Sequence, residues 1–66
     1  MKENFLAIYS EVFDSEGNVL LCGREKCQEL IRLANKLETD VDHGDVKTGY
    51  MNVKSIQKLY KKETQL

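Results

Sequence analysis

A chain of 66 residues with 41% hydrophobic and 32% charged side chains has the composition of one small folded domain rather than of a disordered segment. A domain this small leaves little room for an enclosed catalytic pocket, so we expect a protein that is not an enzyme. Its apolar runs are too short for a signal peptide or for a membrane-spanning helix of about 20 residues, and we expect a cytoplasmic protein without a membrane partner.

The formal net charge of −1 conceals an uneven distribution along the chain. Residues 1–45 carry ten acidic and five basic side chains, whereas residues 46–66 carry five lysines and a single acid, Glu63. A basic segment of this kind attracts anionic partners, whether phosphate, an acidic protein surface or nucleic acid. The candidate anion- or partner-binding residues are therefore its lysines: Lys47, Lys54, Lys58, Lys61 and Lys62.

The first apolar stretch, residues 5–13, fits two patterns. Its large side chains recur at helical spacing, while alternate residues also fit one face of a strand. Residues 14–18 (DSEGN) form a turn cluster, and residues 19–22 (VLLC) have the character of a short buried strand. Because β-branched and aromatic residues flank a turn that contains glycine, we favour an N-terminal β-hairpin, with a helix over residues 5–13 as the alternative.

The clearest predicted element is an amphipathic helix over residues 24–38. Its apolar positions recur every three or four residues, and charged side chains occupy the other face. These apolar positions are Cys27, Leu30, Ile31, Leu33, Ala34 and Leu37.

Residues 40–49 are polar and contain two glycines, so they indicate a loop or a short pair of strands. Asn52 is a candidate N-cap, whose side-chain oxygen would accept from the free amides of a following helix. That helix would place its lysines outside an apolar stripe, with residues 63–66 frayed. The stripe consists of Val53, Ile56, Leu59 and Tyr60.

These elements together predict one small two-layer α+β domain over residues 1–66. It would consist of an N-terminal β-hairpin, a long amphipathic helix, a polar loop and a short basic C-terminal helix. A three-helix arrangement is the alternative if residues 5–13 are helical.

We expect neither a metal nor a cofactor. Cys22 and Cys27 lack the second ligand pair of a zinc site, and their spacing differs from the Cys-x-x-Cys redox motif. Because we expect a cytoplasmic protein, we expect free thiols. The acidic residues of the 40–45 region lack the bidentate glutamate that ends a calcium loop. His43 is expected to be a surface residue of the polar loop rather than a catalytic one.

Two short stretches resemble HPr, the histidine-containing phosphocarrier family of the bacterial sugar phosphotransferase system. LANKLETDV (residues 33–41) is similar to the end of the family's first helix, and NVKSI (residues 52–56) to the start of its second. The resemblance covers residues 24–58 and implies that Ser55 matches a regulatory phosphorylation site. Gly23, which cannot carry a phosphoryl group, stands in the place of the phosphoacceptor histidine, and residues 59–66 leave no room for the family's last strand and helix.

The sequence therefore favours a small non-catalytic protein-interaction or regulatory module. Accessory proteins of phages and mobile elements are one class of protein that fits this description. Its partner would be another protein or a second copy of the chain. Two alternatives remain: a nucleic-acid-binding accessory protein that uses the lysine-rich helix, and a shortened HPr-like regulator phosphorylated at Ser55. The basic segment has no arginine and only Tyr50 and Tyr60 as aromatics, which makes it a poor reader of bases.

Overall fold

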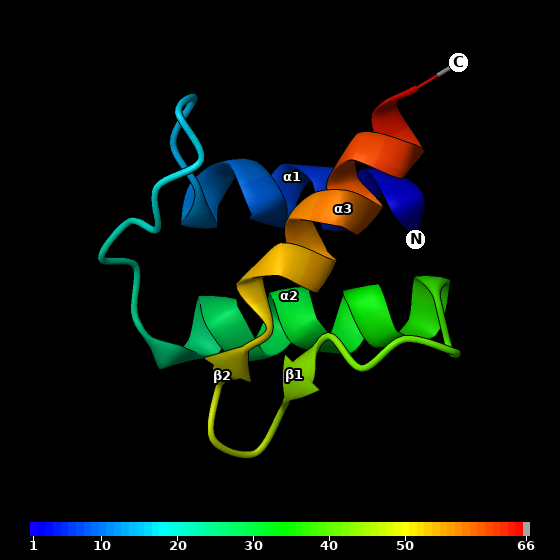
Figure 1. The fold of residues 1–66 in the computed structure, drawn as a ribbon. Coiled ribbons are helices and arrows are strands. Elements are labelled where there is room, and N and C mark those ends of the chain that lie inside the picture. The colour runs from blue at the N-terminus through cyan, green and yellow to red at the C-terminus, as the bar shows by residue number, and fades with distance from the viewer. Residues whose placement is uncertain (66) are drawn as a thin grey trace.

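The computed structural model describes residues 1–65, which form the helices α1 (Lys2–Val12), α2 (Arg24–Leu37) and α3 (Val53–Thr64) and the strands β1 (Gly44–Asp45) and β2 (Tyr50–Met51). α1 and α2 lie side by side and run in opposite directions, and α3 packs across both (Figure 1). β1 and β2 pair antiparallel, with Gly44 opposite Met51, and this hairpin packs against α2 on the side away from α1 (Figure 1).

The predicted N-terminal β-hairpin is wrong, because the chain begins with the helix α1. A strand would have divided the large apolar side chains of residues 5–13 between two faces, and both faces would have needed cover. The helix instead gathers Phe5, Tyr9 and Val12 on one stripe, where all three are buried. The domain remains a small α+β fold, but its hairpin lies between α2 and α3.

The predicted turn at residues 14–18 does form. The Asp14 carboxylate accepts hydrogen bonds from the backbone N–H groups of Glu16 and Asn18, each at 2.9 Å. The chain reverses there, but strand pairing stops at the single bridge between Phe13 and Val19. Residues 19–21, which we expected to form a buried strand, are exposed.

The helices α2 and α3 begin as the sequence predicts, at Arg24 and Val53. Asn52 is the N-cap residue of α3 but makes no side-chain capping hydrogen bond; its Nδ2 donates to the Asp42 carbonyl oxygen at 3.1 Å instead. Helix α3 continues to Thr64, which includes the first two of the residues that we expected to fray. Leu66 lies outside the described residues.

The core lies where the helices meet. The predicted stripes of α2 and α3 face into it, together with the stripe of α1 that the hairpin interpretation missed. The buried apolar side chains are Phe5, Tyr9, Val12, Phe13, Leu30, Ile31, Leu33, Ala34, Ile56 and Leu59.

Candidate functional site

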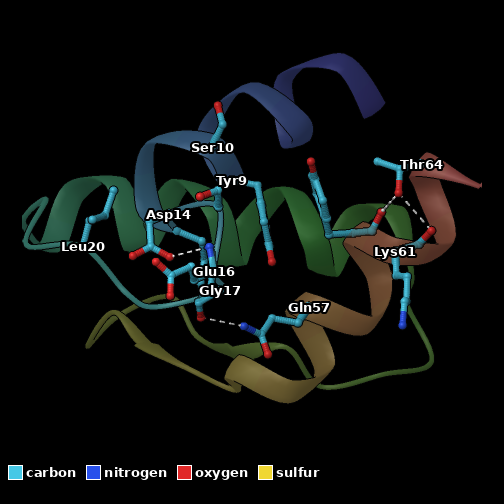
Figure 2. Close-up of a pocket in the computed structure, with 12 residues that line it drawn as sticks. Tyr9, Ser10, Asp14, Glu16, Gly17, Leu20, Gln57, Lys61 and Thr64 are labelled. Atoms are coloured by element: carbon cyan, nitrogen blue, oxygen red, sulfur yellow. Dashed lines mark hydrogen bonds between the residues drawn. The ribbon is translucent and has the colours of Figure 1, made fainter.

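A groove of about 840 Å³ runs between the C-terminal half of α1, the loop at residues 14–20 and α3. Leu20 lies at one end and Thr64 at the other (Figure 2). We call this hollow the α1–α3 groove. Its lining mixes aromatic side chains with the polar residues of the loop.

Stacked aromatic rings form the apolar part of the groove. The ring centroid of Tyr9 lies 3.8 Å from that of Tyr60 and 4.5 Å from that of Phe13, with nearly parallel planes in both pairs. Burial, and secondarily the neighbouring Tyr60, raises the pKa of Tyr9 above its usual value near 10. Tyr9 and Phe13 are buried, so the half-buried Tyr60 is the most exposed ring of the stack.

The loop that forms one rim of the groove is held in place at two points. The hydrogen bond from the Asn18 backbone to the Asp14 carboxylate, with smaller contributions from neighbouring amides, lowers the pKa of Asp14. The side chain of Gln57 in α3 donates to the carbonyl oxygen of Gly17 at 2.9 Å (Figure 2). Gly17 has φ of 85°, a conformation that suits glycine, and an added Cβ would also press against this amide at 3.3 Å. The groove is thus preformed rather than dependent on a partner.

An apolar segment leads away from the groove. Val19, Leu20 and Leu21 are 49%, 42% and 109% exposed, and Leu20 also lines the groove. We call residues 19–21 the apolar segment. Residues 19–22 were expected to form a buried strand, but within residues 1–65 the only sheet is that of β1 and β2, and this segment is not part of it.

The predicted lysines of α3 gather on one side of the helix. At 100° per residue they span a sector of about 100° that points away from the buried Ile56 and Leu59. This lysine face consists of Lys54, Lys58, Lys61 and Lys62, all exposed. Lys61 also lines the α1–α3 groove, so the two features adjoin.

Lys47 and Ser55 have different surroundings. Lys47 lies in the turn between the strands, where Gln28 donates to its carbonyl oxygen at 3.1 Å, and it shares a shallow hollow with acidic side chains of α2. The structure therefore does not bring Lys47 to the lysine face. Ser55 is half-buried and lines a second hollow of about 520 Å³ together with Lys58 and Lys62.

His43 is buried rather than exposed, which corrects the expectation of a surface residue. Its ring Nδ1 lies 2.9 Å from Asn35 Oδ1 and its Nε2 lies 3.1 Å from Glu38 Oε1. Its backbone N–H also donates to Asn35 Oδ1 at 3.1 Å. Lys62 donates to the other Glu38 oxygen at 3.2 Å, and hydrogen bonds from Lys62 and then His43 lower the pKa of Glu38.

This network joins the end of α2, the loop and α3, and sequence reasoning missed it. The partners of His43 precede it by eight and five residues across the end of α2. No local spacing rule connects residues so placed. Because His43 is fully buried and bonded at both ring nitrogens, the network ties the loop to the end of α2 and, through Glu38 and Lys62, to α3.

Within residues 1–65 no three His, Cys, Asp or Glu side chains form a group that would hold a metal ion. Over the same residues no helix has both the length and the apolar character required to cross a membrane.

Comparisons with known proteins give no relative. No family model matches the chain, and neither a curated protein nor a solved structure is similar to it.

Proposed function

We propose that this protein is a small non-catalytic protein-interaction module. Its α1–α3 groove and its apolar segment together would bind an apolar stretch of a partner protein. The observation that carries the proposal is the exposure of Val19, Leu20 and Leu21 beside the α1–α3 groove. Contiguous exposed apolar residues next to a preformed hollow are typical of surfaces that a partner covers. Complete burial of one such side chain contributes about 1.5–3 kcal/mol, so covering this segment would add favourable free energy to a complex with a partner.

The lysine face suggests the charge of that partner. It adjoins the groove through Lys61, so a partner that fills the groove would bring its flanking residues over the lysines. Acidic flanking residues would be attracted, and basic ones repelled. Because exposed ion pairs contribute little to affinity, we assign the lysines to partner selection and association rate rather than to the bulk of the binding energy.

The first test is capture of partners by the immobilised chain from an extract of its native host, with and without nuclease. We expect a nuclease-resistant protein that Leu20→Ser/Leu21→Ser no longer captures. Ala7→Ser, an exposed change on α1 outside the groove lining, is the matched control and should capture as the unchanged chain does. Loss of all capture upon nuclease treatment, or equal capture by the double variant, would reject the proposal.

A second copy of the chain is another occupant of the same surface. Sedimentation equilibrium over a range of concentrations distinguishes it from a different protein. A dimer that Leu20→Ser/Leu21→Ser dissociates would make the partner a second copy.

Nucleic-acid binding is the second candidate, favoured by the gathering of four lysines on one side of α3. The face has no arginine, so recognition would be through phosphates and independent of sequence. With four phosphate contacts, the logarithm of the association constant for a DNA duplex would fall with the logarithm of salt concentration at a slope near −3.6, at about −0.9 per contact. A slope near zero would exclude this function.

The HPr-like regulator stays a third proposal because Ser55 lies near lysine side chains that would attract a phosphate. A bacterial kinase that modifies HPr provides the test. Failure to phosphorylate Ser55, with Ser55→Ala as the matched blank, would dismiss it.

A further inference from the structure

The two cysteines occupy related positions around the start of α2. Gly23 is the N-cap, so Cys22 immediately precedes the cap and Cys27 is the fourth residue of the helix. Side chains at these two positions face each other across the first turn, as in the hydrophobic staple that fixes the entry of a chain into a helix. Both are free, half-buried thiols.

The thiols interact with each other. Burial raises the pKa of Cys27 first, and the charge and side-chain hydrogen bond of Cys22 raise it further. The Cys22 sulfur also lies 3.9 Å from the carbonyl oxygen of Gly23, the N-cap residue of α2, so it is turned toward the beginning of the helix.

Gly23, which separates Cys22 from the helix that carries Cys27, permits adjustment. Gly23 has φ of 88°, and a Cβ placed on it would meet nothing within 4 Å. A disulfide requires the two Cβ atoms to lie about 3.5–4.5 Å apart. A glycine in open space allows Cys22 to approach this geometry without displacing the core.

We propose that Cys22 and Cys27 are a redox modification site that forms a reversible intramolecular disulfide. The site is independent of the proposed partner-binding function. It would join the end of the apolar segment to the first turn of α2, because Cys22 directly follows Leu21.

The oxidant is a low-molecular-weight disulfide such as glutathione disulfide. The Cys22 thiolate attacks one glutathione sulfur, the S–S bond of glutathione breaks, and one glutathione thiolate leaves and takes up a proton. The Cys27 thiolate then attacks the Cys22 sulfur of the mixed disulfide and releases the second glutathione. The protein loses two electrons and two protons, and one glutathione disulfide becomes two glutathione thiols.

The test is equilibration of the full chain in glutathione redox buffers, followed by acid quenching, alkylation and mass spectrometry. We expect a species that has lost two hydrogens and carries neither glutathione nor alkyl groups. Cys22→Ser and Cys27→Ser should give only mixed disulfides with glutathione.

Closeness in sequence alone would also favour some disulfide in an unfolded chain, so the same equilibrium is measured in concentrated urea. We expect the native fold to raise the equilibrium constant for the intramolecular disulfide by about tenfold or more over the unfolded chain. An equal or smaller constant in the native state, or only glutathione adducts and intermolecular dimers, would overturn the proposal. This comparison uses the unchanged chain, so it holds even if a serine variant fails to fold.

Discussion

Replacing His43 with alanine should remove most of the stability of this domain. The ring is fully buried and makes two side-chain contacts, to Asn35 Oδ1 and Glu38 Oε1. Loss of each hydrogen bond costs about 1 kcal/mol, and the space left by the ring raises the total to about 2–4 kcal/mol. A domain of this size has only about 3–5 kcal/mol of net stability, so the variant should be partly unfolded at 25 °C.

The assay is urea unfolding followed by far-UV circular dichroism. Asp40→Ala is the matched control, since Asp40 is an exposed residue of the same connection, and its unfolding free energy should stay within about 0.5 kcal/mol of the parent chain. His43→Gln retains a donor and should fall between the two. If His43→Ala unfolds at the same urea concentration as Asp40→Ala, the buried network does not hold the loop to α2 and our reasoning fails.

Three further predictions concern the same fold. The pKa values of Glu38 and Asp14 are lowered by folding, so the stability they contribute is present above their unfolded values near 4 and should be lost as pH falls through the lower folded values. Urea titrations between pH 7 and pH 2 should show this loss; Glu38→Gln should reduce it, and an unchanged profile would refute the assignment. Tyr60→Leu keeps apolar bulk but removes the stack on Tyr9, and should cost about 0.5–1.5 kcal/mol in unfolding free energy; no change would mean that the rings do not stack in solution. Ile56→Ala empties a fully buried position and should cost about 2–5 kcal/mol in the same assay, so a smaller loss would contradict its place in the core.

The amphipathic helices were the predictable part of this fold. The stripes of α2 and α3 are regular, and charged residues clearly mark their outer faces, so periodicity alone located both. Residues 5–13 were ambiguous because nearly every position there is apolar and two periods fit equally well. The choice between them depends on how much surface the rest of the chain can cover, which is a property of the assembled domain.

Of the candidate site, only the lysine face could be predicted from the sequence. Positions four and seven residues apart on a helix place lysines on one side, so the lysine face followed from the sequence. The groove did not, because it depends on how α1 crosses α3. The capping hydrogen bond expected from the Asn52 side chain does not form, for a similar reason. The Nδ2 of Asn52 instead donates to the carbonyl oxygen of Asp42, ten residues earlier in the chain. His43 was misplaced because a polar neighbourhood in sequence gave no sign of the buried partners that the end of α2 supplies.

The central claim is that the apolar segment and the adjoining groove bind a protein partner. The most direct test is the dissociation constant of the captured partner, measured by isothermal titration calorimetry for the parent chain, for Leu20→Ser/Leu21→Ser and for Ala7→Ser. Both leucines are exposed, so the double change should leave the urea midpoint unaltered. Its dissociation constant should rise by about tenfold or more, which corresponds to about 1.4 kcal/mol or more of lost burial. An unchanged dissociation constant for a stably folded double variant would contradict the account.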